Sequence, residues 1–268
     1  MKKYKIIDAH CHIYPEAIVG KAVEAIEAFY DNRYKGFDGT AETMLRNGET
    51  AGVEHYVIFS VATTPRQVHS INSFIADRVQ KSRGVFTGLG TLYPYSESLE
   101  SDFGELVSLG LKGVKLHPDF QKIPIDDERC QEIYRLCSGK IPVLLHTGDY
   151  RYDFSNPDRM KRMLEKFPDC TFIGAHFGGW SVWEKATAEL SSYDNFYVDT
   201  SSSLSDISTE TASMLVESYT PDRVLFGTDY PLGDSKKEIE LLKKAVEDES
   251  QLEKILCLNA KRLFDIKF

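Results

Sequence analysis

Short apolar runs alternate with longer amphipathic segments along the whole chain. The apolar runs have the length and composition of buried strands, and the segments between them have helical spacing. Strands are predicted at residues 5–10, 53–61, 85–92, 111–117, 143–146, 171–176, 196–200 and 224–228. Helices are predicted at residues 17–30, 66–81, 99–109, 127–137, 157–166, 182–191, 209–217 and 236–247.

Eight strand–helix repeats indicate a parallel sheet whose strands are joined by helical crossovers. An open doubly wound sheet is the alternative, but such sheets usually carry a Gly-rich phosphate turn after the first strand. Here that place is occupied by Asp-Ala-His-Cys-His. We therefore predict an α/β fold of the (β/α)8 TIM-barrel type, as a single domain over residues 1–268. The long segment 36–50 is predicted to hold an extra short helix near the barrel mouth.

Composition restricts the class of function. Hydrophobic residues make up 42% of the 268 residues and the net charge is −9, without the basic clusters that nucleic-acid binding requires. The N-terminus lacks the apolar stretch of a signal peptide, and no apolar run reaches membrane-spanning length. Five cysteines without a C-x-x-C pair favour neither disulfides nor a cysteine zinc site. We expect a cytoplasmic protein with a small-molecule substrate, no nucleic-acid or membrane partner, and homo-oligomerisation left open.

Unusual polar residues gather at the ends of the predicted strands. Five of the seven histidines lie there, and a carboxylate ends the eighth strand. These residues are His10, His12, His117, His146, His176 and Asp229. In TIM barrels the carboxyl ends of the strands form the catalytic face. The pattern therefore predicts an active site at this end.

His10 and His12 are two residues apart on one strand, so both imidazoles are expected to face the barrel axis while Cys11 faces the helices. Asp8 is expected on the same face as the two histidines. Such a pair can bind one metal ion. Together with His146 and Asp229 it would complete a set of three histidines and one aspartate, which suits zinc and tolerates manganese or iron.

Three other residues near the strand ends have more than one candidate role. His176 could hold a second metal, polarise a substrate carbonyl or shuttle a proton. Lys115 and His117 share one inward face, and a buried lysine must meet a carboxylate, shift its pKa or be modified. A carboxylated Lys115 bridging two metals and a salt bridge to Asp8 or Asp229 are both open. Among loop residues, Arg151 is the expected clamp for a substrate carboxylate. Trp180 and Tyr230 are expected to line the pocket.

These motifs, in this order, resemble the amidohydrolase superfamily, and within it the amidohydrolase-2 branch. That branch holds hydrolases, lactonases, hydratases and metal-dependent decarboxylases related to aminocarboxymuconate-semialdehyde decarboxylase. The matching motifs are Asp-Ala-His-Cys-His, Gly-Val-Lys-Leu-His-Pro, Leu-Leu-His-Thr-Gly, Ala-His-Phe-Gly-Gly, Gly-Thr-Asp-Tyr-Pro and the terminal Asn-Ala-Lys-Arg-Leu-Phe. The resemblance spans nearly the whole chain.

The resemblance implies that His10, His12 and His146 are metal ligands and that Asp229 is both a ligand and the base that handles protons. It implies that His176 orients or protonates the substrate. One or two ions, zinc first, are expected. Hydrolysis of a small amide, lactone or ester by metal-activated water is the leading hypothesis. Non-oxidative decarboxylation or hydration of a small carboxylic acid is the second, and a barrel that has lost catalysis and serves as a scaffold is the third.

Overall fold

The computed structural model describes residues 5–33 and 35–267 of the chain. Its strands are β1 Ile7–His12, β2 His55–Phe59, β3 Phe86–Gly88, β4 Gly90–Thr91, β5 Val114–Leu116, β6 Val143–Leu145, β7 Phe172–Gly174, β8 Phe196–Asp199 and β9 Val224–Leu225. All paired strands are parallel and follow one another in chain order. β3 and β4 are halves of one barrel strand, because Leu89 N bonds Ile58 O of β2 while Gly90 N bonds Gly113 O beside β5.

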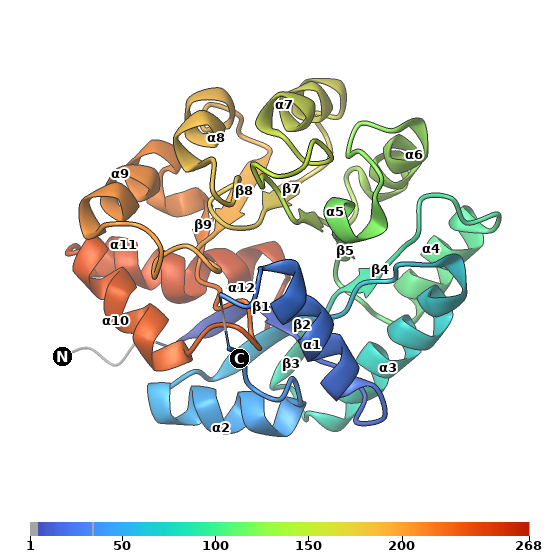
Figure 1. The fold of residues 1–268 in the computed structure, drawn as a ribbon, viewed down its shortest axis with the longest axis horizontal. Coiled ribbons are helices and arrows are strands. Elements are labelled where there is room, and N and C mark those ends of the chain that lie inside the picture. The colour runs from blue at the N-terminus through green and yellow to red at the C-terminus, as the bar shows by residue number, and fades with distance from the viewer. Residues whose placement is uncertain (1–4, 34, 268) are drawn as a thin grey trace.

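The sheet closes between its last and first strands. Ala9 N donates to Phe226 O at 2.8 Å, Asp229 N to His10 O at 3.0 Å and His12 N to Tyr230 O at 2.7 Å. These bonds join the segment after β9 to β1, so the strands form a ring in the centre of Figure 1. The predicted (β/α)8 barrel is confirmed.

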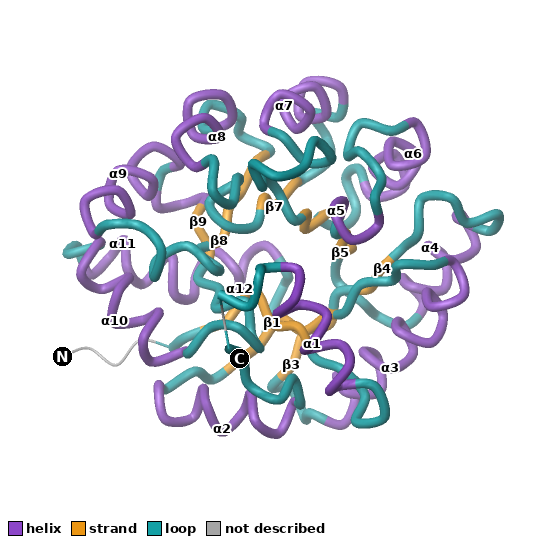
Figure 2. Tube along the Cα trace, viewed as in Figure 1, coloured by secondary structure: helices purple, strands orange, loops and turns teal. Residues whose placement is uncertain are grey.

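Helices surround the strands as an outer ring (Figure 2). The helices of the described residues are α1 Val19–Phe29, α2 Ala41–Ala51, α3 Val68–Lys81, α4 Leu99–Ser108, α5 Pro118–Gln121, α6 Glu128–Cys137, α7 Pro157–Lys166, α8 Trp183–Leu190, α9 Thr209–Tyr219, α10 Ser235–Ala245, α11 Glu249–Glu253 and α12 Asn259–Leu263. Local sequence sets several ends: Pro157 opens α7, and Gly110 adopts φ 75° just after α4. Within residues 5–33 and 35–267, no helix is both long and apolar enough to cross a bilayer.

Buried apolar side chains form two layers, one inside the barrel and one between strands and helices. The inner layer includes Ile7, Ala9, Val57, Phe59, Leu89, Leu144, Ile173 and Leu225. Cys11 belongs to the outer layer, as predicted. A β-bulge between Asp8 and Cys11 interrupts the alternation of β1, and Asp8 therefore points away from the inward face of His10 and His12. Asp8 instead accepts from Thr228 N and Oγ1, which ties β1 to the segment after β9.

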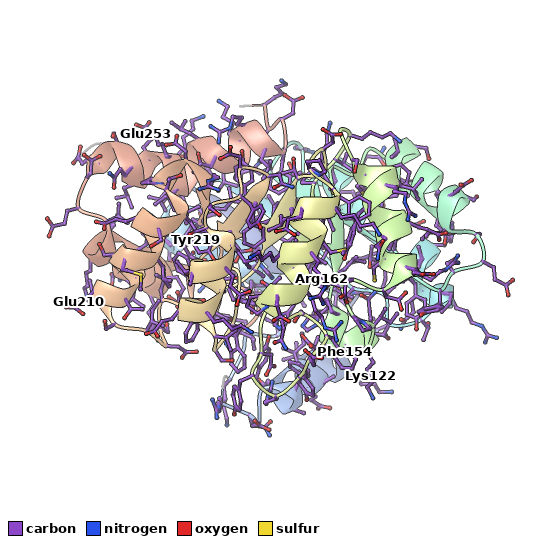
Figure 3. The ribbon with its side chains drawn as sticks, turned by 90° about the horizontal axis from the view of Figure 1, so that it is seen from above. Lys122, Phe154, Arg162, Glu210, Tyr219 and Glu253 are labelled. Atoms are coloured by element: carbon purple, nitrogen blue, oxygen red, sulfur yellow. The ribbon has the colours of Figure 1, made fainter. Side chains whose placement is uncertain are left out.

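The two helices between β1 and β2 exchange the positions expected from the sequence. α2, predicted as an extra helix at the mouth, packs into the outer ring beside α10, and Asn47 donates to Asp234 at its start. α1, predicted as an ordinary barrel helix, lies instead over the carboxyl ends of the strands. In Figure 3 it projects at the same end as Lys122 and Phe154 in the loops after β5 and β6, opposite Glu253 of α11. The prediction was wrong because periodicity shows that a helix has an apolar face but not which surface that face covers.

We expect the stability of the barrel to depend on pH through Glu238 of α10. Its side chain is buried, accepts from Ser205 Oγ at 2.6 Å, and leaves Oε2 without a hydrogen bond from any described residue. Burial raises the pKa of this carboxyl from 4.5 to about 7. Because the folded state holds the proton more tightly than the unfolded chain, the stabilising contribution is present at acidic pH and is lost as pH rises through about 7.

Between pH 5 and pH 9 the unfolding free energy of the wild type should fall by up to about 3 kcal/mol through the ionisation of Glu238. Glu238→Gln should not show this loss. Urea unfolding at both pH values measures the difference. The exposed Glu240 on the same helix supplies the control, and Glu240→Gln should keep the pH dependence of the wild type. An equal pH dependence in Glu238→Gln and the wild type would contradict this role.

Candidate metal centre

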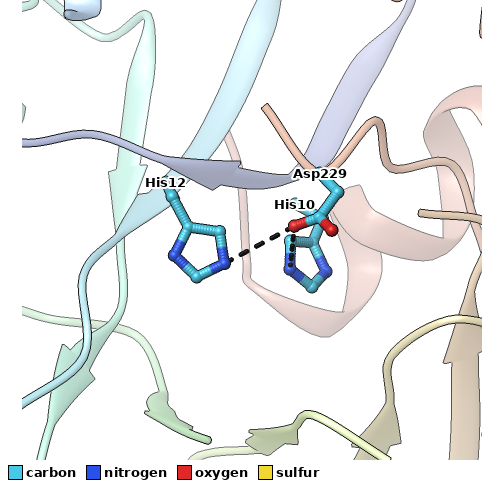
Figure 4. A group of neighbouring side chains, drawn as sticks. All are labelled: His10, His12 and Asp229. Carbon is cyan, nitrogen blue, oxygen red and sulfur yellow. Dashed lines mark ion pairs between the residues drawn. The ribbon is translucent and has the colours of Figure 1, made fainter. Parts of the chain in front are cut away.

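His10, His12 and Asp229 come together at the barrel mouth, as Figure 4 shows. Asp229 Oδ1 lies 3.2 Å from His10 Nε2 and 3.6 Å from His12 Nε2. All three side chains are buried. Asp229 has the left-handed backbone angle φ 62°, a strained conformation that the hydrogen bond from Asp229 N to His10 O holds in place. The turn after β9 is thus fixed so that its carboxylate faces the two imidazoles.

A second carboxylate, Asp199 at the end of β8, orients His10. Its Oδ2 lies 2.7 Å from His10 Nδ1, and its Oδ1 accepts from His176 N at 3.1 Å. Ser201 Oγ also lies 3.1 Å from His10 Nδ1 and bonds to Asp199. A proton held on Nδ1 by Asp199 leaves the Nε2 lone pair directed at the site, which is the usual carboxylate–histidine–metal arrangement.

The pKa shifts of Asp229, His12 and His10 bear on whether these side chains can bind a metal ion. Burial alone would raise the pKa of Asp229, but the neighbouring His10, His176 and His12 hold the pKa of this carboxyl well below its usual range. Burial also lowers the pKa of His12 well below its ordinary value. For His10, burial and Lys115 lower the pKa, but Asp199 and Asp229 outweigh them and raise it. Asp229 is therefore ionised and His12 neutral, which are the states in which a carboxylate and an imidazole bind a metal ion.

The separations of these donor atoms fit a bound ion. Two atoms that each lie about 2.1 Å from one ion at a tetrahedral angle are about 3.4 Å apart. The observed 3.2 and 3.6 Å bracket that value. With two imidazole nitrogens and one carboxylate oxygen, His10, His12 and Asp229 could hold a divalent metal and leave a coordination position open.

The other strand-end histidines form a neighbouring group. His146 lies with His117 and Asp119: the two imidazole rings stack with centroids 4.0 Å apart, and Asp119 Oδ2 is 3.4 Å from His146 Nε2. On its other edge, His146 Nδ1 lies 3.0 Å from His176 Nε2. His146, expected as a third ligand, is thus displaced from the first group, with His176 adjoining both His10 and His146.

Lys115 of β5 is fully buried beside the first group. Its Nζ lies 3.4 Å from His10 Nε2 and 5.1 Å from the centre of the Phe59 ring. Among residues 5–33 and 35–267, no carboxylate oxygen lies within ion-pair distance of Nζ, so neither Asp8 nor Asp229 forms the salt bridge considered above. Burial lowers the pKa of this ammonium to about 8. Lys115 is a buried donor close to where a substrate would meet the metal.

A narrow pocket leads to these groups. Its free space is about 10 Å³, close to what a single water molecule needs, about 10–15 Å³. Its polar lining consists of His10, His12, Lys115, His117, His146, His176 and Asp229, and the rest of its wall is formed by Ile26, Tyr30, Phe120, Pro231 and Leu232. α1 therefore supplies part of the pocket wall.

Three expected pocket residues lie behind this wall instead of lining it. Trp180 is buried against Tyr30, with ring centroids 5.1 Å apart. The Tyr230 hydroxyl donates to Thr40 O at 2.8 Å, so its neighbours Pro231 and Leu232 face the pocket in its place. Arg151 is engaged by the protein: its guanidinium forms two bonds to Asp149, at 2.9 and 2.7 Å.

Arg151 fastens α1 to the barrel. One nitrogen donates to Phe29 O at 2.7 Å, at the end of α1, and the guanidinium lies 4.9 Å from the Phe29 ring and 5.4 Å from the Trp180 ring. Removing it should cost α1 about 2–3 kcal/mol, because bonds to charged groups carry this much. We expect Arg151→Met to speed amide exchange in α1 by at least ~10-fold, as measured by hydrogen–deuterium exchange. Arg162→Met, on the exposed side of α7, is the control, and equal exchange rates in α1 would count against this role.

Solved structures with the same fold cover almost the whole chain. An uncharacterized TIM-barrel protein from Bordetella bronchiseptica has a TM-score of 0.81 at 23% identity, covering 97% of this chain and 98% of its own. The 5-carboxyvanillate decarboxylase from Sphingomonas paucimobilis has a TM-score of 0.75 at 16% identity, covering 98% and 100%. A dihydroxybenzoic acid decarboxylase from Polaromonas, solved with manganese and the inhibitor 2-nitroresorcinol, has a TM-score of 0.70 at 17% identity, covering 98% and 97%.

No curated protein matches the sequence of this chain. A family model does match it, over residues 7–266, and its description is amidohydrolase. The match runs from the first residue of β1 past the end of α12, so it includes every strand end described above. The chain therefore belongs to the amidohydrolase family, in its amidohydrolase-2 branch.

Proposed function

We propose that this protein is a metal-dependent hydrolase that acts on a small carbonyl compound, such as an amide, a lactone or an ester. The observation that carries the proposal is the ionised Asp229 carboxylate 3.2 and 3.6 Å from two imidazole nitrogens at the base of a pocket. His10, His12 and Asp229 would hold the ion. Zinc suits nitrogen and oxygen donors of this kind, and manganese and iron are tolerated.

When bound, a divalent ion supplies Lewis-acid activation of water and of a carbonyl oxygen. Asp229 supplies the base. Its Oδ2 accepts from Ser202 Oγ at 2.6 Å, so Oδ1 is the oxygen that faces the reacting groups. In this proposal, Oδ1 accepts the proton of the attacking water and returns it to the leaving group.

Hydrogen bonds fix which neighbours can donate to a developing oxyanion. His117 Nδ1 accepts from Phe120 N at 3.3 Å, so the neutral ring carries its proton on Nε2. His176 Nδ1 lies 2.9 Å from Ser201 O and donates to that carbonyl, so its Nε2 bears a lone pair. Lys115 and His117 are therefore assigned as donors to negative charge, while His176 is an acceptor that can take or pass a proton.

The pocket favours a small substrate with an apolar part. Ile26, Tyr30 and Leu232 form its apolar wall above the polar groups. A compact lactone or cyclic amide would part these side chains to place its carbonyl toward Lys115 and His117 and its ring against the wall.

Non-oxidative decarboxylation is the second candidate at the same centre, because two of the similar structures described above are decarboxylases of aromatic acids. In that case Lys115 would receive the substrate carboxylate, since Arg151 is bound to Asp149.

The two functions are separated by products. Protein loaded with zinc or manganese is tested against lactones, cyclic amides and aromatic carboxylates, with acid release and carbon dioxide release measured in parallel. Acid release without carbon dioxide supports the hydrolase, and carbon dioxide from the carboxylates supports the decarboxylase. Turnover that is equal with and without a chelator would contradict both.

A further inference from the structure

The pocket at the metal centre is closed in this structure. Its free space of about 10 Å³ admits little more than one water molecule. Even a small lactone or amide is larger than that, so part of the wall must move before a substrate can reach Lys115 or Asp229. The apolar wall has three sources: α1 and its end supply Ile26 and Tyr30, α5 supplies Phe120, and the turn after β9 supplies Pro231 and Leu232.

Two of these three walls are bonded to the barrel. In α5, Gln121 Nε2 donates to Ala62 O at 3.0 Å and to Leu92 O at 3.1 Å, which fastens this helix to the segments after β2 and β4. In the turn after β9, Leu232 N donates to Asp229 O at 2.8 Å, and Asp229 N is itself bonded to β1. Movement of either wall would therefore break bonds that hold the strand ends together.

The third wall, α1, is buried far less. Of its 11 residues, all of which the structure describes, only Ile26 is fully buried, whereas α6 buries five of its 10. The first turn of α1 has neither a side-chain cap nor an acidic residue to stabilise it. Segments with little buried apolar surface are the parts of a protein that open most readily.

α1 stands on a narrow base. Tyr14 N donates to Gly39 O at 3.1 Å, so the chain that leaves β1 and the chain that returns toward α2 lie side by side. Phe37 N also donates to Pro231 O at 2.8 Å on the returning side. Both ends of the excursion are thus fixed to the barrel, and the helix between them can move while β1 stays in place.

Arg151 holds the far end of α1 down. Its guanidinium donates to Phe29 O at 2.7 Å and to Asp31 Oδ2 at 3.2 Å, and it is itself held by buried Asp149. The Phe29 ring packs against Phe120 of α5, with centroids 4.6 Å apart. These contacts keep α1 against α5 and the loop after β6, and they use no side chain that would hold the metal.

We propose that residues 15–33, with α1 at their centre, form a lid that opens to admit substrate, and that Arg151 and Phe29 are its latch. In the closed state Ile26 and Tyr30 fill the entrance, and in the open state they leave it together with α1. This inference rests on the proposed function, which makes the pocket the active site. Lids of this kind close over bound substrate and separate the reacting groups from bulk water.

The test measures how fast a small reagent reaches the histidines beneath the lid. Metal-free protein is treated with diethyl pyrocarbonate, which acylates neutral imidazole, and the rate at each histidine is followed by peptide mass spectrometry. His69 on α3, with its side chain 75% exposed, is the internal reference. We expect His12 and His146 of the wild type to react far more slowly than His69. Both should react at least ~10-fold faster in Arg151→Met and in Phe29→Ala, with His69 unchanged.

The two variants weaken the latch in different ways, because Phe29→Ala keeps the backbone carbonyl that Arg151 binds. Circular dichroism and urea unfolding establish that each variant is folded, and if Arg151→Met is not, Phe29→Ala decides alone. Arg162→Met is the matched control and should keep the wild-type rates.

Rates at His12 and His146 that are the same in the wild type and the folded latch variants would overturn the proposal. Wild-type rates as high as that of His69 would do so too. A protein that turns over none of the substrates in the product screen would contradict the proposed function, whereas the labelling rates would still decide whether α1 is a lid.

Discussion

Replacing Asp229 by asparagine is expected to lower turnover by at least about a thousandfold and to leave the barrel folded. In the group formed by His10, His12 and Asp229, the carboxylate faces both imidazoles and is ionised, so it can accept a proton. Loss of a general base typically costs ~10²–10⁴ in rate. Asparagine keeps the shape and an oxygen for Ser202 Oγ, which bonds Oδ2 in the wild type, so the turn after β9 should persist.

Circular dichroism and thermal unfolding of Asp229→Asn establish that the fold is intact, and turnover is measured on the substrate found in the product screen. Asp77→Asn is the control, since Asp77 lies on the exposed face of α3, paired with Lys81. Its turnover should equal that of the wild type. An Asp229→Asn variant with near-normal turnover would refute the assignment of Asp229 as the base.

The second large expected effect is a difference in stability between variants of His10 and of His12. Both His10→Asn and His12→Asn should lose zinc binding, because each removes one of the imidazole donors. Their stabilities should differ. His10 contacts buried Asp199 at 2.7 Å, whereas His12 Nδ1 makes no hydrogen bond to any residue that the structure describes. Removing one member of a buried charge pair costs about 3–5 kcal/mol. We expect His10→Asn to be destabilised by about 3 kcal/mol and His12→Asn to stay close to the wild type.

Urea unfolding in the presence of a chelator measures the two stabilities without any contribution from a bound ion. Zinc affinity is measured on the same preparations. Equal stabilities would show that the contact between His10 and Asp199 is not the structural support inferred here. Zinc binding retained in both variants would place the ion elsewhere.

The strand ends were predictable from sequence because each carries a strong local signal. An apolar run followed by His146 or His176 indicates a buried strand that ends in a polar group, and the barrel brings such ends together. The approach of His10 and His12 to Asp229 needed no further information, since β1 and the end of β9 adjoin once the ring closes.

Two carboxylates were missed although each stands at a strand end. Asp199 is the last residue of β8, and Asp119 follows His117 by two residues. Aspartates occur too often near turns to stand out as histidines do. Their position at the same edge as Asp229 was the available signal.

The other features that the sequence did not predict are the partners of individual side chains. Nothing in the sequence shows that Arg151 turns back to Asp149 and Phe29, because that pairing depends on where α1 packs. The tautomers of His117 and His176 likewise depend on single backbone contacts, with Phe120 N and Ser201 O. Such contacts form in three dimensions and leave no periodic pattern.

We propose that His10, His12 and Asp229 hold a divalent ion on which catalysis depends. Elemental analysis of protein purified without chelator, before and after dialysis against chelator and zinc, tests it most directly. We predict at least one divalent ion per chain, lost to the chelator together with turnover and regained with added zinc or manganese. A folded protein that binds neither zinc nor manganese would contradict the account.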